Sequence, residues 1–401
     1  MINSRVPSSL LVSRIATDIV QQQNSLAAVQ EQISTGKKIN RPSDAPAETA
    51  HLLSMGETIS RIEQYTENSS IAESQLALEE GALAGTTSAL NRVRDLVLRV
   101  NTDTANAGFR EETNSEVKLI REELFSLANA RDSFGNYLFG GNNIHDLPFK
   151  PGNPPTYSGS DETTKMEIAL GRTIETGDSG IDVFMRIRNG NGDFNTTADP
   201  ANTGSGIVEK GAVTDGSLAR GGNYSITFNS NNDFDVIDDM TGAVVLAAEP
   251  YESGSRINLP GMTFSINGVP DAGDTFSVVP SEYEDIFTTM SNLIDSLDKT
   301  PIDSKTRADG QSALNTAVAQ IDNALMHFNT TRAKVGTRLS SIESSRNENE
   351  SIGLQIERIK QNVEDVDIAD AVTRLQTQAN SLEILQKSFT RIEGLSLFNF
   401  M

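Results

Sequence analysis

The sequence predicts a mainly α-helical protein that carries a β-rich insert. Apolar residues recur every three or four positions over long stretches toward both ends of the 401-residue chain, which is the period of an α-helix. Residues 151–284, in contrast, hold 18 of the 30 glycines and 8 of the 13 prolines, between short alternating apolar runs typical of antiparallel strands. We therefore expect a long α-helical coiled-coil or bundle rod, formed by both chain ends, with an outer antiparallel β domain.

The two terminal segments each carry a narrow apolar stripe whose steps alternate mainly between three and four residues, as in a heptad seam. Helices with so narrow a stripe usually need a packing partner, and little partner surface exists at the ends of a chain. We therefore predict that the stripes form an assembly seam that becomes ordered only against neighbouring chains. The seam residues are Val12, Ile15, Ile19, Leu26, Val29, Ile33, Leu375, Leu382, Leu385, Phe389, Ile392 and Leu395.

The inner helical segments also repeat at seven residues, and here we expect an ordinary core within the chain. Apolar residues at Val117, Ile120, Leu124, Leu127 and Phe134 extend the same pattern. The strict repeats comprise Leu76, Leu83, Leu90 and Val97 before the insert, and Leu314, Ile321, Phe328, Val335 and Ile342 after it.

Composition changes and helix-breaking residues predict the domain boundaries. Pro42 and Pro46 mark a loop after the first helix, because proline disfavours helical geometry in the residue before it. Asp365 and Asp367 are suited to cap the last helix. The predicted segments are 1–35, which pairs with 366–401 as an inner helical layer, then 36–150 and 285–365 as the two halves of a helical rod domain, and 151–284 as the outer β domain.

Composition argues against several classes of function. The 33 basic and 55 acidic residues give a net charge of −22, which disfavours binding to nucleic acid or anionic lipid. Cysteine is absent, which removes thiol catalysis and disulfides, and there are only three histidines. No apolar run is long enough to span a membrane, and the N-terminus lacks the features of a cleavable signal peptide.

The motifs that could carry chemistry fail in detail. Residues 190–195 lack the last glycine of a dinucleotide-binding loop. Residues 229–235 resemble the start of a calcium loop, but Phe234 stands where the turn needs glycine, which favours a hairpin loop. His51 and His327 are expected to pack between helices. We predict no catalytic, cofactor-binding or metal-binding residue, no cofactor and no enzymatic activity.

Residues 32–46, QISTGKKINRPSDAP, resemble the N-terminal signature of the flagellin superfamily. Their form is most similar to that of the proteins at the hook–filament junction, although Ala45 stands where those usually have aspartate. Residues 137–139 resemble the same family's step from helix into insert, and residues 395–400 its C-terminus. The motif positions are Gly36, Asn40, Arg41, Pro42, Ser43, Asp44, Tyr137, Leu138, Phe139, Leu395 and Phe398.

This resemblance implies a structural component of the bacterial flagellum that joins the hook to the filament and supports motility. It implies assembly with copies of itself between hook-associated protein 1 and flagellin. It also implies an extracellular location reached through the flagellar type III apparatus, by an unfolded chain without a cleavable signal peptide, with a cytoplasmic chaperone on the C-terminal segment.

Three alternatives remain at this stage. The first is flagellin itself, the bulk filament subunit, which the form of residues 40–44 and 137–139 disfavours. The second is an adhesin or enzyme housed in the β insert, which deletion of residues about 190–260 would reveal. The third is a cytoplasmic coiled-coil scaffold, which would stay inside the cell.

Overall fold

The computed structural model describes residues 8–102, 107–152, 154–219, 222–230, 232–299 and 303–398, and only the backbone of residues 8, 9, 11, 12, 219 and 392–398. The chain forms two compact units. The first comprises Met1–Glu67 and Arg346–Met401, and the second comprises Asn68–Ser345. Two long helices, α2 (Pro46–Val100) and α6 (Ser304–Glu364), contribute residues to both units.

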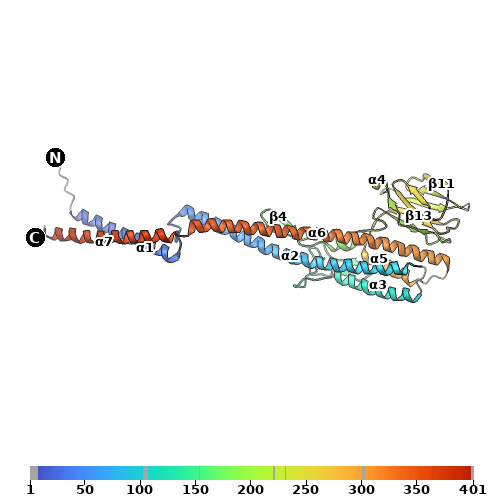
Figure 1. Cartoon of the computed structure of the whole chain (residues 1–401), viewed down its shortest axis with the longest axis horizontal. Coiled ribbons are helices and arrows are strands. Elements are labelled where there is room, and N and C mark those ends of the chain that lie inside the picture. The colour runs from blue at the N-terminus through green and yellow to red at the C-terminus, as the bar shows by residue number, and fades with distance from the viewer. Residues whose placement is uncertain are drawn as a thin grey trace. The chain divides into compact units, whose positions relative to one another are not determined.

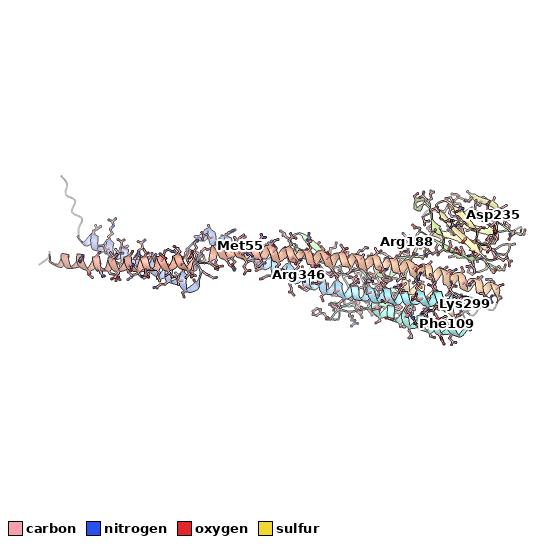
Figure 2. The ribbon with its side chains drawn as sticks, viewed as in Figure 1. Met55, Phe109, Arg188, Asp235, Lys299 and Arg346 are labelled. Carbon is pink, nitrogen blue, oxygen red and sulfur yellow. The ribbon has the colours of Figure 1, made fainter. Side chains whose placement is uncertain are left out.

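The described part of the first unit is helical except for the connections at residues 36–45 and 365–367. Helix α1 (Ser8–Thr35) lies beside α7 (Ile368–Phe398), as Figure 1 shows. The start of α2 and the end of α6 complete the unit, and Met55 on α2 is buried within it (Figure 2). The Asp367 carboxylate accepts hydrogen bonds from the amides of Ala369 and Asp370 at 2.9 and 3.1 Å, so the predicted cap of the last helix is confirmed.

The second unit is built on the remainder of α2 and α6, which run antiparallel. Arg332 on α6 pairs with Glu80 on α2 at 2.6 Å, and Arg94 pairs with Asp322 at 2.5 Å, so the partner number falls as the number on α2 rises. Helices α3 (Ala107–Ala128) and α5 (Ile286–Asp298) pack against each other in the same unit. All nine residues of the two strict heptad repeats are buried in one core, which confirms their predicted role.

The first part of the predicted β insert packs onto this helical core. Its elements are β1 (Phe149–Lys150), β2 (Thr156–Tyr157), β3 (Lys165–Ala169), β4 (Arg172–Glu175), the π-helical turn η1 (Ile181–Met185) and β5 (Ile187–Arg188). Phe149, Ile168, Ile174 and Phe184 belong to the same core as the helices. The structure therefore differs from a single outer β domain over 151–284, because apolar side chains along this stretch face the helices.

Phe134 was expected in the helical core, and this prediction was wrong. Helix α3 ends at Ala128, so the heptad pattern has no helix to continue on. The Asp132 carboxylate accepts hydrogen bonds from the amides of Phe134 and Asn136, and Gly135 adopts a φ of +87°, a left-handed conformation that favours glycine. Phe134 consequently lies at the tip of a turn and is 91% exposed.

The rest of the insert forms a β domain with its own hydrophobic core. One antiparallel sheet has the strand order β11-β10-β9-β14-β6, and a second has β12-β13-β7, with β8 also paired to β13. The strands are β6 (Phe194–Ala198), β7 (Ile207–Val208), β8 (Ala212–Val213), β9 (Tyr224–Phe228), β10 (Asp233–Asp238), β11 (Val244–Pro250), β12 (Arg256–Leu259), β13 (Met262–Asn267) and β14 (Thr275–Pro280), with a short helix α4 (Gly216–Ala219). Alternate residues of β9, β10 and β14 face the core, as the period-two pattern predicts.

The candidate calcium loop is a hairpin connection between β9 and β10. Phe228 pairs with Phe234 across the hairpin. The Asn229 side-chain amide donates to the carboxylates of Asp233 and Asp235 at 2.8 and 3.1 Å. These carboxylates are thus held by an internal donor, and among the described residues no cluster of acidic and histidine side chains has the arrangement of a metal site.

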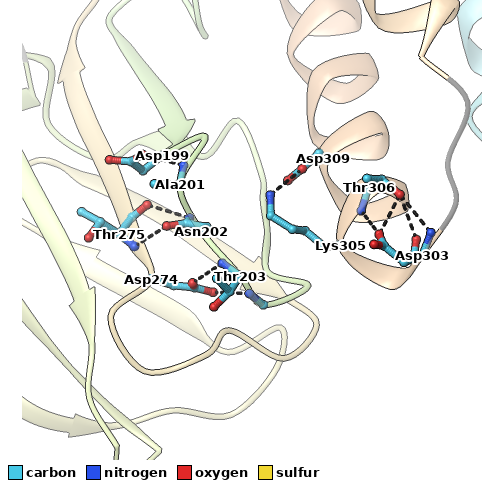
Figure 3. A network of polar contacts seen from close by, with 11 residues as sticks. Asp199, Ala201, Asn202, Thr203, Asp274, Thr275, Asp303, Lys305, Thr306 and Asp309 are labelled. Carbon is cyan, nitrogen blue, oxygen red and sulfur yellow. Dashed lines mark hydrogen bonds and ion pairs between the residues drawn. The ribbon is translucent and has the colours of Figure 1, made fainter.

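Polar contacts fix the loop after β6 and the start of α6 (Figure 3). The Asp274 carboxylate, which is buried, accepts hydrogen bonds from the amides of Thr203 and Gly204 at 2.7 and 3.0 Å. At the beginning of α6, the Asp303 carboxylate accepts a hydrogen bond from the Thr306 amide at 2.7 Å, which satisfies one of the free donors of the first turn.

The β domain joins the helices through a small two-stranded sheet. Strand β5, which carries Arg188 (Figure 2), pairs with β15 (Tyr283–Glu284). The Arg188 guanidinium stacks over the Tyr283 ring at 4.4 Å. The Asn323 side chain on α6 donates to the Gly190 carbonyl at 2.7 Å. The chain therefore leaves and returns to the helical part at adjacent points.

Candidate assembly surface

The apolar contact between α1 and α7 lies on the predicted seam. Val29 and Ala371 are buried together with Val366, and Ile33 and Leu375 pack against them. The Gln22 side chain donates to the Gln378 carbonyl at 3.2 Å, which shows that the helices are antiparallel. Gln22, which lies between Ile19 and Leu26 in the spacing of the N-terminal stripe, thus bonds to the facing helix.

The structure brings the two predicted stripes into one helix pair. Among the described seam residues, only Val29 is buried. The others are half-buried, and they are Ile15, Ile19, Leu26, Ile33, Leu375, Leu382, Leu385 and Phe389. The side chains of Val12, Ile392, Leu395 and Phe398 lie outside the described residues. Each stripe therefore covers the other only in part, and the role of the stripes in contacts between chains stays a prediction.

Sequence reasoning missed a second set of apolar residues on these helices. Each is about half exposed or more in the single chain, and they are Leu10 and Val20 on α1 and Ile368, Val372 and Ile384 on α7. Ile368 and Val372 continue the steps of seven, four and three backward from Leu375 and could have been found from the pattern, whereas the other three follow no such step.

The part of the motif that follows α1, from Gly36 onward, is hydrogen-bonded to the end of α6 and to the connection between α6 and α7. Gly36 ends α1 with a φ of +72°, a left-handed conformation that costs little only for glycine. The Lys38 amide donates to the Glu364 carbonyl at 2.6 Å, and the Val366 amide donates to the Gly36 carbonyl at 3.0 Å. The Lys37 ammonium also pairs with the Glu364 carboxylate at 2.5 Å, and this bond raises the pKa of Lys37.

The remainder of the motif, Asn40–Asp44, closes a turn between α1 and α2. The Asp44 carboxylate accepts hydrogen bonds from the amides of Asn40 and Arg41 at 3.3 and 2.9 Å. Arg41 reaches back to Glu31 on α1 at 3.3 Å. Pro42 and Ser43 form the exposed tip of the turn. The residues Asn-Arg-Pro-Ser-Asp thus form a turn that is held by its own hydrogen bonds, and this turn connects α1 to α2.

An open groove of about 780 Å³ lies beside this turn, inside the first unit. Ile39, Pro42, Leu52 and Leu53 give it an apolar lining. Its charged lining residues are Lys37, Arg41, Glu57, Lys360 and Glu364. Sequence reasoning did not identify this groove.

The second motif, residues 137–139, lies inside the second unit. Tyr137 and Phe139 are buried, and Leu138 packs against the same core. Arg131 stacks over the Tyr137 ring at 4.3 Å. The Phe139 carbonyl accepts hydrogen bonds from the Tyr157 hydroxyl at 2.9 Å and the Gly180 amide at 3.0 Å. This motif therefore fixes the start of the insert onto the helices.

The histidines show no arrangement for catalysis in the described part of the chain. The ring Nε2 of His327 lies 2.8 Å from the Asp182 carbonyl oxygen, and burial lowers the pKa of this side chain. His51 is exposed, so the expectation that it packs between helices was wrong. Among the described helices, none has a stretch both long and apolar enough to cross a bilayer.

Comparison with known proteins agrees with this arrangement. Residues 8–144 match the family described as the bacterial flagellin N-terminal helical region. The chain is 23% identical to flagellar hook-associated protein 3 of Escherichia coli (strain K12), over 96% of this chain and 98% of that protein. It is 24% identical to a flagellin of Clostridium tyrobutyricum, over 91% of this chain and 92% of that one.

A solved structure supports the same assignment. The flagellar junction protein FlgL from Legionella pneumophila superposes with a TM-score of 0.70 at 29% identity, over 79% of this chain and 99% of that chain. These names are those of flagellar components, which argues against an enzyme. With its helical ends and central β domain, the chain resembles flagellar hook-associated protein 3 over nearly its whole length, and its first part matches the bacterial flagellin N-terminal helical region.

Proposed function

We propose that this chain joins the flagellar hook to the flagellin filament. The observation that carries the proposal is the α1–α7 pair, whose apolar stripes cover each other only in part. Half-buried apolar side chains gain free energy when a neighbouring copy removes them from water. Contacts between copies at these helices would extend without closing, as a stacked helical assembly requires.

In this proposal the predicted segments take up concentric positions. Residues 1–35 and 366–401 form an inner helical layer, and residues 36–150 and 285–365 form the layer around it. Residues 151–189 pack on the helices of this second layer, and the β domain of residues 190–281 faces outward. One end of the assembly contacts hook-associated protein 1, and the other end receives flagellin.

The route to this position is export of the unfolded chain by the flagellar type III apparatus. The lack of cysteine fits such a route, since no disulfide can form before export. A cytoplasmic chaperone on the C-terminal segment would keep the exposed apolar residues of α7 away from other chains. The finished protein then lies outside the cell, at the hook–filament junction.

The proposal predicts a specific defect in a strain that lacks the gene. Hooks should form normally, attached filaments should be absent, and flagellin should accumulate in the medium as monomers. Gold-labelled antibody on isolated hook–filament complexes of the parent strain should mark the junction only. A strain complemented with the full-length gene provides the control.

Label along the whole filament would contradict the junction role and identify a bulk flagellin instead. This second candidate is kept because the matching family, over residues 8–144, is that of flagellins. Filaments that remain attached in the deletion strain would overturn both the junction role and the flagellin role.

An adhesin or enzyme in the β domain can be tested separately. Arg188 and Tyr283 are paired neighbours, so residues 190–281 can be replaced by a short turn that leaves the helical core intact. We expect this variant to support filament assembly and swimming, because the core and the terminal helices do not include the removed residues. Loss of a binding or hydrolytic activity with motility intact would favour the alternative role.

A further inference from the structure

A buried carboxyl lies where the β4–η1 turn meets the helices of the second unit. Glu79 on α2 is 1% exposed. Its Oε1 accepts a hydrogen bond from the Asp178 amide at 3.2 Å. Asp178 belongs to residues 175–180, which comprise the last residue of β4 and its connection to η1, so this contact holds the turn against the helix.

The charges around Glu79 do not balance. Arg338 on α6 donates to the carboxylates of Glu175 and Asp178 at 2.5 and 2.9 Å, and the side chains of Arg338 and Asp178 are 16% and 15% exposed. One guanidinium thus faces three carboxyl groups, since Glu79 lies beside the same pair. Lys165 on β3 lies 3.7 Å from Glu175, at its other oxygen.

Two oxygens at this point also lack a hydrogen-bond partner among the described residues. They are Oε2 of Glu79 and Oδ2 of Asp178, and Nη1 of the Arg338 guanidinium likewise has no hydrogen-bond partner among the described residues. Two carboxylates in a poorly hydrated site repel each other, so one of them holds a proton. Burial raises the pKa of Glu79 to about 8, and the charge of Asp178 adds to this effect while Arg338 opposes it.

We propose that Glu79 and Asp178 form a proton-binding pair that holds residues 175–180 against α2 and α6, and that this attachment weakens as the medium becomes alkaline. The shared proton supplies the donor that the two free oxygens lack. Its loss leaves two negative charges in contact.

The direction and range of the effect follow from the pKa of Glu79 in the two states. When the turn opens, the pKa of Glu79 returns to its usual value of 4.5, whereas the closed turn keeps this pKa near 8. The closed state is therefore fully favoured below pH 4.5. Between about pH 4.5 and 8 it holds one proton more than the open state, so opening rises up to about tenfold per pH unit and then levels off.

Hydrogen exchange on the full-length protein measures this opening at the amides of Asp178 and Gly180. Their protection factors, corrected for the intrinsic pH dependence of exchange, should fall up to about tenfold per pH unit between pH 5 and 8. The Glu79→Gln variant should show no such fall, because its amide stays neutral and can donate to Asp178. Glu80→Gln, which removes the neighbouring carboxylate paired with Arg332, should keep the wild-type slope.

A wild-type protection factor that does not change with pH, or an equal slope in Glu79→Gln, would overturn the proposal. A second measurement needs no variant. In the native protein, the carboxyl carbon resonance of Glu79 should titrate with a midpoint near pH 8. A midpoint near the ordinary value of a glutamate would also refute it.

Discussion

The Phe184→Ala variant should lose about 3–5 kcal/mol of stability in the second unit. Phe184 is fully buried, and its ring lies within 5.0–6.2 Å of the rings of Phe139, Phe149, Phe287 and Phe328. Alanine would leave a cavity where segments far apart in the sequence meet, and it would also remove the aromatic contacts. The measurement is urea unfolding followed by circular dichroism at 222 nm.

Phe134→Ala is the matched control for this prediction. The same atoms are removed, but the side chain is 91% exposed, so the free energy of unfolding should stay within about 0.5 kcal/mol of wild type. If the two variants were equally stable, the aromatic cluster would not be the centre of the core. The comparison therefore tests the assignment of both phenylalanines.

The second large effect is expected from Leu382→Asp in α7. Leu382 is half-buried in the single chain, and the proposal places it against neighbouring copies in the assembly. There the substitution would bury an unpaired carboxylate, which costs several kcal/mol. Cells that carry this variant should export the protein but lack attached filaments, as seen by electron microscopy, and they should not swim.

Gln376→Asp adds the same charge at an exposed position of α7 and should leave assembly unchanged. Urea unfolding should show that the second unit of Leu382→Asp retains its wild-type stability, since Leu382 belongs to the first unit. Full-length attached filaments in the Leu382→Asp strain would contradict the seam. Loss of filaments in both strains would show that added charge, and not the seam position, is responsible.

The candidate site was predictable in part. The residues of the terminal stripes follow from the alternating steps of three and four, and the structure places the described ones in one helix pair. The groove lined by Ile39, Leu52 and Leu53 was not predictable, because adjacent leucines on one helix follow no period and gain meaning only from the α6 residues beside them. The same holds for Glu79, which looks like any surface glutamate of a helix until the β4–η1 turn covers it.

The fold class and the helical core of this protein were predictable from residue periodicity alone. A seven-residue repeat such as Leu76 to Val97 requires one buried face, and that requirement is local to the helix. Periodicity did not predict that residues 149–187 pack on the helices while residues 194–278 form a separate core, or that Phe134 is exposed. The physical reason is that periodicity defines which residues share a face, whereas the partner of that face is set by contacts between residues far apart in the chain.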